Sequence, residues 1–550
     1  MKNSVNNIIV ARISKYIFEL LGSVRLSYLP PLMVYMAAGI SGLTGIVGTF
    51  FIKDYLDLPA DFLAMLGFWA GLPWALKMPL GHLVDLIWRW KSLLVLLGAG
   101  LIAASLAIML ALISSPLILI PYMPLESWFV LAALLAPVGY VVQDVVADAM
   151  TVEAVPTLDD SGRPFNSGEL KLMHTTMQTL GRVAIISGGL AVALVNVFLF
   201  NDVGNMVEGE KIAVYTKIYQ LAMLIPLISV SGVILAEILK RLQRRKLALQ
   251  KRAGKLQHWP QGGTETADEA IRPNWWILGG SFVFVLFTLG MGLAQVPFNQ
   301  EIIFTGSMAI VVFLMAKLVK ELKPAARRTL VGTAIVIFVF RAIPGPGAGA
   351  GWWQIDILGF DQQFMSKLSL IGSSLALFGM FVFRRFMAEK SIFYVVGFLT
   401  VAGSLLSLPI IGMFYGLHEW TSSFTHGLVD ARFIAVVDTA LESPLGQVAM
   451  IPMLAWIANS APPHLKATFF AVMASFTNLA LSLSSLLTKY LNQFFIISRE
   501  LADPLNGQSV TSSDYSQLGM LLITVTAIGL FLPLLTIFLV NAKRSPLRSR

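Results

Sequence analysis

The chain contains no cysteine and little charge, and both deficits narrow its possible functions. Without cysteine it can have no disulfide framework, no thiolate metal site and no cysteine nucleophile. Asp, Glu, Lys and Arg make up only 13% of its 550 residues, whereas soluble domains contain about 25%. The six histidines are scattered, without the pairing that a zinc-binding helix requires. The sequence therefore argues against metal catalysis and predicts no cofactor.

What the chain has in excess is hydrophobic sequence. Hydrophobic residues form 56% of it, and its mean hydropathy is +0.74, as expected of a polytopic membrane protein. The net charge of +9 would suggest a nucleic-acid partner for a soluble protein, but basic cytoplasmic loops explain it better here. No cleavable signal peptide is apparent. Residues 1–31 are mixed and amphipathic, and we expect them to lie along the inner membrane face.

Apolar runs long enough to cross the roughly 30 Å hydrocarbon core of a bilayer recur along the chain. They comprise residues 32–52, 62–80, 92–113, 128–150, 172–200, 218–239, 275–296, 302–319, 330–343, 364–383, 392–414, 433–457, 468–495 and 518–540. The sequence therefore predicts an all-α integral membrane protein with about 14 transmembrane helices. The alternative is a count of twelve, in which one run of the pair inserted after the linker, 275–296 or 302–319, lies in the membrane interface.

A basic linker divides these runs. Residues 240–255 hold eight basic residues and no acid, and such a stretch stays in the cytoplasm. The expected domains are the N-terminal segment 1–31, a six-helix half at 32–239, the linker 240–274, an inserted helix pair at 275–322, a second six-helix half at 323–541 and a basic tail at 542–550. Lys and Arg are also concentrated in alternate connections. This bias predicts a protein of the plasma (inner) membrane with both termini in the cytoplasm.

Acidic side chains inside the predicted spans are the first candidates for function, because each is costly in lipid unless it faces a partner or a water-filled cavity. Asp144 and Asp148 are four residues apart, hence on one helix face. Two carboxylates on one face repel, which favours protonation of one, so the pair is a candidate proton relay. Asp438 and Glu442 form a similar pair in the second half. For Asp148, and for Glu153 at the inner end of its helix, the competing interpretation is a structural charge network that holds an inward gate shut.

Three cations inside the predicted spans are further candidates for function. They are Lys77, Arg182 and Arg341. Each could pair with a buried acid or bind an anionic substrate, which Arg does with bidentate geometry. Lys77 is also close enough to the inner end of its span to reach the membrane interface. Trp74 could stack on a planar ligand, whereas Trp352 and Trp353 are expected to be interfacial anchors.

A short charged turn joins the second and third predicted spans. Gly81, Asp85, Arg89 and Lys91 fall in it at the spacing G-x-x-x-D-x-x-x-R-x-K. This pattern looks like the loop between the second and third helices of a major facilitator transporter. We expect Asp85 and Arg89, with the turn residue Gly81, to form an inner gate against the fourth span. Their expected partner there is Asp148 or Glu153.

Further motifs give a narrower resemblance. They are P-W-x-x-K-x-P-x-G-x-x-x-D at residues 73–85, D-V-V-A-D-A at 144–149, L-G-F at 358–360, G-Q-V-A-M-I-P-M-L-A at 446–455 and A-P-P-x-x-x-A-T-F-F-A-V-M-A-S-F-T-N-L at 461–479. With these motifs the chain resembles the folate-biopterin transporter family of the major facilitator superfamily. The resemblance implies a major facilitator fold and import of folates or pterins, commonly with protons. The functional positions that it implies are Lys77, Asp85, Asp144, Asp148, Asp438 and Gln447.

The segment Q-D-V-V-A-D-A is also similar to muropeptide permeases, so the ligand stays open between the two groups. In either case the expected activity is secondary active transport by alternating access, in which two halves rock about a central site. The expected substrate-binding residues are Arg182, Arg341, Lys77, Trp74 and Gln447. The expected partners are a folate- or pterin-like anion, protons and the lipid bilayer, with no nucleic acid.

The sequence also argues against two other classes of membrane protein, an ATP-driven pump and an intramembrane enzyme. An ATP-driven pump is disfavoured, because the sequence contains no G-x-x-x-x-G-K-[S/T] motif. An intramembrane enzyme would need convergent acids or histidines at a membrane face. Asp159 and Asp160 are adjacent acids in an expected inner loop, but they lie in a Gly- and Pro-containing turn that is typical of solvated residues. We therefore expect the chain not to be an enzyme.

Overall fold

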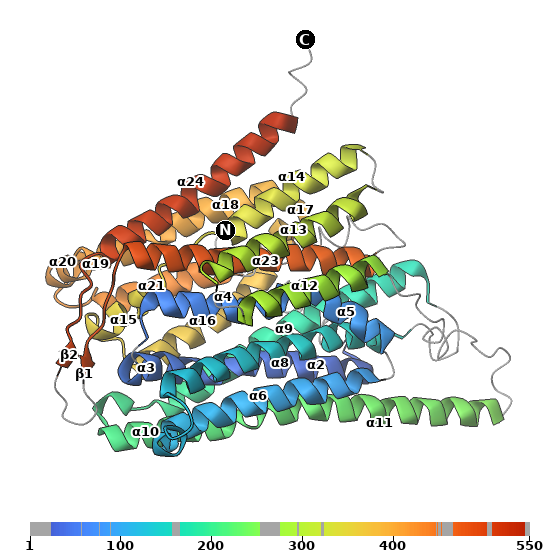
Figure 1. Cartoon of the computed structure of the whole chain (residues 1–550), viewed down its shortest axis with the longest axis horizontal. Coiled ribbons are helices and arrows are strands. Elements are labelled where there is room, and N and C mark those ends of the chain that lie inside the picture. The colour runs from blue at the N-terminus through green and yellow to red at the C-terminus, as the bar shows by residue number, and fades with distance from the viewer. Residues whose placement is uncertain are drawn as a thin grey trace, which may run out of the picture.

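The computed structural model is a bundle of long helices that lie side by side (Figure 1). It describes residues 24–56, 58–75, 77–87, 90–156, 165–252, 275–293, 296–320, 324–446, 466–502 and 509–544, together with Gly22, Val448 and Met453. The predicted site residues Arg89 and Gln447 lie outside this part of the chain, as do the segments 1–21 and 253–274.

The chain as far as Arg252, which lies within the predicted basic linker, forms a succession of helices. They are η1 (Leu26–Tyr28), α2 (Leu29–Ile40), η2 (Ser41–Thr44), α3 (Gly45–Tyr55), α4 (Ala60–Ala75), α5 (Lys77–Leu86), α6 (Lys91–Ser114), α7 (Pro116–Leu119), α8 (Leu125–Ala154), α9 (Ser167–Leu199), η4 (Val203–Asn205), α10 (Glu208–Ala222) and α11 (Ile225–Arg252). The predicted run 62–80 falls on α4, which is described as far as Ala75, and on α5, which is described from Lys77.

The chain after the linker is also helical, apart from one short strand pair. Its elements are α12 (Trp275–Leu293), α13 (Asn299–Val319), α14 (Pro324–Arg341), α15 (Ala348–Asp356), α16 (Gln362–Val382), α17 (Arg384–Glu389), α18 (Ile392–Leu406), α19 (Leu408–Phe414), α20 (Leu417–Phe424), α21 (Ala431–Glu442), η5 (Ser443–Leu445), α23 (Lys466–Phe494), β1 (Leu501–Ala502), β2 (Ser509–Thr511) and α24 (Leu518–Arg544). The strands β1 and β2 pair antiparallel between α23 and α24.

Within the described residues, nine helical segments are long and apolar enough to cross a membrane. They are Leu26–Tyr55, Lys91–Ser114, Leu125–Thr151, Thr176–Asn205, Glu208–Leu242, Asn299–Lys317, Gln362–Val382, Ile392–Phe414 and Leu518–Ala542. Each coincides with one of the predicted runs, which confirms an integral membrane protein of helical class. The count of about 14 spans is not confirmed and stays a prediction, because the other runs fall on broken, shorter or incompletely described helices.

Local sequence explains where several helices begin. A capping box precedes α9, in which the Asn166 side chain accepts a hydrogen bond from the Glu169 amide at 2.8 Å and the Glu169 carboxylate accepts one from the Asn166 amide at 2.9 Å. Asp361, Ser391 and Asp430 similarly cap α16, α18 and α21. These polar residues satisfy backbone amides that the first turn of a helix leaves without partners.

Glycines allow the closest helix crossings in the bundle. A Cβ added to Gly98 of α6 would lie 2.7 Å from the carbonyl oxygen of Gly139 in α8. A Cβ at Gly188 of α9 would likewise lie 2.7 Å from the carbonyl oxygen of Met36 in α2. Such contacts hold helices together in membranes, where no hydrophobic force drives one apolar helix against another. They fix α2 and α6 against α8 and α9, the helices that carry the predicted acids and Arg182.

Two helix pairs make the most extensive contacts between the first part of the bundle and the second. α4 packs along α23, and α9 packs along α16. Small residues line the first contact, where Gly67 and Gly71 face Ser485 and Ser482. The α12–α13 hairpin lies beside this contact, with α13 against α23 and α12 against α5. In Figure 1, α12 and α13 are the green helices that cross the middle of the view.

The structure corrects the expectation for Trp352 and Trp353. Their exposed fractions are 2% and 4%, and both belong to a hydrophobic core cluster that includes Phe360 and Leu518. They are therefore internal packing residues of α15 and not interfacial anchors.

Candidate functional site

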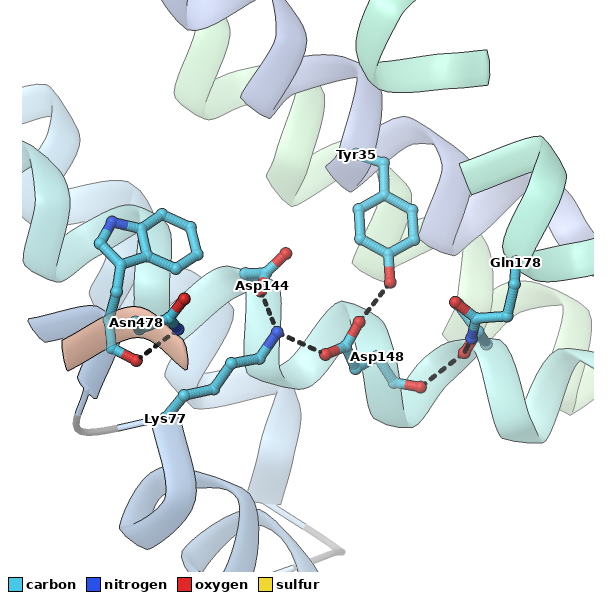
Figure 2. A network of polar contacts seen from close by, with 8 residues as sticks. Tyr35, Lys77, Asp144, Asp148, Gln178 and Asn478 are labelled. Atoms are coloured by element: carbon cyan, nitrogen blue, oxygen red, sulfur yellow. Dashed lines mark hydrogen bonds and ion pairs between the residues drawn. The ribbon is translucent and has the colours of Figure 1, made fainter. Parts of the chain in front are cut away.

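Lys77 forms the centre of a polar cluster inside the first part of the bundle. Its Nζ lies 2.5 Å from Asp144 Oδ2 and 2.7 Å from Asp148 Oδ2. The two carboxylates come from successive turns of α8, as their spacing predicts, and Lys77 reaches both from the first position of α5. Figure 2 shows the Lys77 side chain extended toward α8 between the two acids. Lys77 therefore pairs with the two acids of α8 and does not extend to the membrane interface.

Two further helices contribute to this cluster. The Tyr35 hydroxyl of α2 donates a hydrogen bond of 2.5 Å to Asp148 Oδ1, on the side away from Lys77 (Figure 2). Arg182 of α9 is close enough to interact electrostatically with Asp144 and Tyr35. We call Tyr35, Lys77, Asp144, Asp148 and Arg182 the Lys77 cluster. Its formal charges sum to zero when both carboxylates are ionised.

Exposure differs among the members of the Lys77 cluster. Exposed fractions are 18% for the Asp144 side chain and 20% for Lys77, but 38% for Asp148. Asp148 is thus the carboxylate that water or a solute reaches most easily. Neighbouring residues also hold its turn of α8 in place, since the Thr151 hydroxyl donates to the Asp148 carbonyl at 2.6 Å and Gln178 donates to Thr151 at 3.3 Å (Figure 2).

Three predicted site residues of the second part are described, and of these only Arg341 interacts with a member of the Lys77 cluster. Arg341 ends α14, contacts the Met453 sulfur at 3.6 Å and interacts electrostatically with Arg182. Within the described residues it has no carboxylate partner. Asp438 and Glu442 lie on α21 and interact with each other, and no contact in the described part of the chain joins them to the Lys77 cluster.

Trp74 is half-buried beside the cluster, and the Asn478 side-chain amide of α23 donates a hydrogen bond of 2.9 Å to its backbone carbonyl. The indole packs against a core cluster that includes Val84 and Val141. Trp74, three residues before Lys77, therefore connects α4 to α23 in this structure.

Asp148 and Glu153, the two acids of α8 predicted to take part in the inner gate, have other partners in this structure. Glu153 pairs with Lys91 at 2.5 Å, which joins the end of α8 to the start of α6. Asp148 belongs to the Lys77 cluster. Gly81 and Asp85 lie on α5, but the Asp85 side chain is not among the described ones. A gate between Asp85 and α8 therefore remains a prediction.

A second polar cluster, which no sequence pattern indicated, joins distant parts of the chain at one end of the bundle. Lys53 Nζ lies 2.5 Å from Asp356 Oδ1, and Lys53 is 8% exposed. The Tyr515 hydroxyl also donates to Asp356. Arg499 donates to the Leu56 carbonyl, and its guanidinium lies 4.4 Å from the Trp352 ring centroid. Lys53, Asp356, Arg499 and Tyr515 are named the Lys53 cluster below.

Burial, aided by the hydrogen bond to Asp356, raises the pKa of Tyr515 well above its usual range. Its hydroxyl therefore stays protonated and keeps donating to Asp356 at physiological pH. Two hydrogen bonds beside the Lys53 cluster also connect the two parts of the bundle, from Gln362 to Tyr215 and from Gln363 to Asn201, both at 2.8 Å. In Figure 1, α3, α15 and the strand pair lie together at this end of the molecule, and α5 lies toward the other end.

Comparison with protein families decides what kind of molecule carries these clusters. Residues 38–546 match the model of the BT1 family. The chain belongs to the BT1 family. This confirms the resemblance to folate-biopterin transporters, and it makes the protein a multi-pass membrane transporter and not an enzyme.

A curated relative agrees with the BT1 assignment. The "Folate-biopterin transporter" of Synechocystis sp. (strain ATCC 27184 / PCC 6803 / Kazusa) is 26% identical over 212 residues, which are 38% of this chain and 38% of the relative. The match thus spans well under half the length of either protein.

Solved structures of other transporters share the fold of this BT1 chain. A peptide transporter POT in complex with sulfate has a TM-score of 0.57 at 15% identity, with 94% of each chain covered. A point mutant of the nucleoside transporter NupG has a TM-score of 0.52 at 12% identity, with 95% of this chain and 100% of that one covered. At these identities the likeness concerns the fold alone, which is like that of major facilitator transporters.

Proposed function

We propose that this BT1 transporter imports folate- or pterin-like organic anions together with protons, by alternating access across the plasma (inner) membrane. The observation that carries the proposal is the Lys77 cluster, in which one buried cation is shared by two carboxylates of different exposure. The name of the cyanobacterial relative supports the substrate class. The positive-inside bias of the loops supports cytoplasmic termini.

Two arginines are suited to the anionic part of such a substrate. Arg182 and Arg341 come from α9 and α14 and are close enough to repel each other electrostatically. An anion between them would relieve this repulsion, and a guanidinium can hold a carboxylate through two parallel hydrogen bonds. Because the two residues belong to different predicted halves, a shared substrate would also draw those halves together.

Proton coupling follows from the arrangement of charges in the Lys77 cluster. If Asp148 takes up a proton, Lys77 retains Asp144 as its partner and the cluster gains one positive charge. That charge makes the cavity more favourable for an anion, and binding of the anion in turn favours the protonated state. Proton and substrate would therefore enter the site together.

Alternating access also requires contacts that break when the transporter opens. We assign the Lys53 cluster to this role at the outer end, because its ion pair joins α3 to α15, which belong to different predicted halves. In this assignment the structure is closed to the outside. Asp85 and Arg89 remain the proposed gate residues at the inner end.

The test is uptake by proteoliposomes of labelled folate, labelled biopterin and a labelled muramyl peptide, each with and without an inward proton gradient. Folate or biopterin uptake that rises with the gradient is expected. Arg341→Gln should raise the KM for the anion, whereas Arg241→Gln, which removes an exposed arginine paired with Glu237, should not. Failure of folate and biopterin to enter under either condition would count against the substrate, and muramyl peptide uptake would favour a muropeptide permease. A chemical product without vectorial transport would instead favour an enzyme.

A further inference from the structure

The outward side of the α12–α13 hairpin carries a groove that the transport mechanism does not use. Its volume is about 540 Å³, and the residues that shape it include Trp275, Trp276, Gly279, Gly280, Ala309 and Phe313. The aromatic side chains are largely exposed, at 76% for Trp275 and 51% for Phe313. The opposite side of the hairpin packs against α5 and α23. The groove therefore faces away from the rest of the bundle, toward the bilayer.

Small residues keep this groove open. A Cβ added at Gly279 would meet no atom within 4 Å, so this position is open space between larger side chains. Gly280 differs, because its Cβ would lie 3.3 Å from Leu314. Gly280 thus allows α12 to pack closely against α13, whereas Gly279 leaves space on the surface of α12 for a molecule from outside the protein.

A cation lies at one end of the otherwise apolar groove. Lys317 Nζ is 3.3 Å from the ring centroid of Trp276 and 5.4 Å from that of Phe313. More positive charge follows at the same end of the hairpin, since Lys320 is exposed just beyond α13 and Arg327 and Arg328 are exposed early in α14. In the proposed topology this end is cytoplasmic, where anionic lipids attract basic residues.

We propose that the groove binds one anionic phospholipid, with an acyl chain over Gly279 and the phosphate beside Lys317. The apolar groove with a single cation at its interfacial end matches the two parts of such a lipid. Tryptophans such as Trp275 and Trp276 are typical of the depth at which headgroups begin. A second copy of this chain would offer an apolar surface to the groove, but it would leave the Lys317 charge without a counter-charge. The proposal does not depend on the identity of the transported solute.

The test is native mass spectrometry of the purified full-length protein, equilibrated with equal amounts of phosphatidylglycerol and phosphatidylcholine. We expect preferential retention of phosphatidylglycerol. Lys317→Gln should lower the ratio of bound phosphatidylglycerol to phosphatidylcholine about fivefold, the loss expected for one basic residue at an anionic surface. Gly279→Leu should fill the groove and lower the retention of both lipids.

Two matched controls test the groove itself. Gly290→Leu adds the same side chain to another open position of α12, and Lys390→Gln removes a lysine that lies 5.3 Å from the Tyr394 ring on a different helix. Both should leave the lipid ratio unchanged. Equal retention of the two lipids by the unsubstituted protein, or an unchanged ratio in Lys317→Gln, would overturn the proposal. A dimer that Gly279→Leu dissociates, with no change in bound lipid, would overturn it in favour of self-association.

Discussion

Replacing Lys77 by Met is the most direct test of the Lys77 cluster, because it removes the charge and keeps most of the side-chain length. Two unit charges 2.5 Å apart, the separation from Lys77 Nζ to Asp144 Oδ2, attract by about 7 kcal/mol at an effective dielectric constant of about 20. Desolvation offsets much of this attraction. The expected cost of leaving a buried charge without its partner is about 3–5 kcal/mol, with Asp148 contributing less because it is 38% exposed.

The interaction itself can be measured by a double-mutant cycle of Lys77→Met and Asp144→Asn. We expect the double variant to be more stable than the sum of the two single changes predicts, by about 2 kcal/mol or roughly 30-fold in the unfolding equilibrium. The assay is the free energy of unfolding in detergent micelles titrated with dodecyl sulfate. Uptake should be lost in both single variants and not restored in the double variant, since restoring stability does not restore the proton site.

The control cycle combines Lys77→Met with Glu153→Gln. Glu153 lies on the same helix as Asp144, but its partner is Lys91 at 2.5 Å. These two changes should therefore add to within about 0.5 kcal/mol. Additive effects of Lys77→Met and Asp144→Asn would refute the reasoning, because they would mean that the ion pair contributes nothing to the stability of this state.

Three further predictions concern other contacts. Lys53→Asp and Asp356→Lys should each reduce uptake, and the charge-swapped double variant should recover part of it; no recovery would argue against a gate at their 2.5 Å ion pair. Tyr35→Phe removes a hydrogen bond to the Asp148 carboxylate and should destabilise the protein by about 1.5 kcal/mol; an unchanged free energy of unfolding would contradict this. Gly139→Val places a Cβ 2.6 Å from the Gly98 carbonyl oxygen and should destabilise the protein by about 1–3 kcal/mol, whereas Gly100→Val, at an open position of α6, should be tolerated in the same unfolding titration.

The sequence predicted best what depends on local pattern. Hydropathy located the nine described helical segments that are long and apolar enough to cross a membrane, because the bilayer demands a minimum apolar length whatever the neighbours. The four-residue spacing also placed Asp144 and Asp148 on one face of α8, which the structure confirms. Both predictions needed only the geometry of a single helix.

Partners distant in sequence were harder to predict. Lys77 reaches Asp144 across 67 positions of chain, and the sequence left open whether it would pair, bind substrate or extend to the interface. The ion pair of Lys53 with Asp356 depends on how α3 lies relative to α15, and no local sequence pattern predicts that arrangement. Trp352 and Trp353 were predicted wrongly for the same reason: near a span end an indole is typical of the interface, but here surrounding helices cover it.

The position of the α12–α13 hairpin has a mechanical consequence. Because α12 lies against α5 and α13 lies against α23, the hairpin straddles the line along which the first part of the bundle meets the second. Any change in the angle between α5 and α23 must alter how the hairpin sits in the bilayer. We therefore expect the thickness of the membrane to bias the angle between these two helices, since hydrophobic mismatch costs a fraction of a kcal/mol for each ångström.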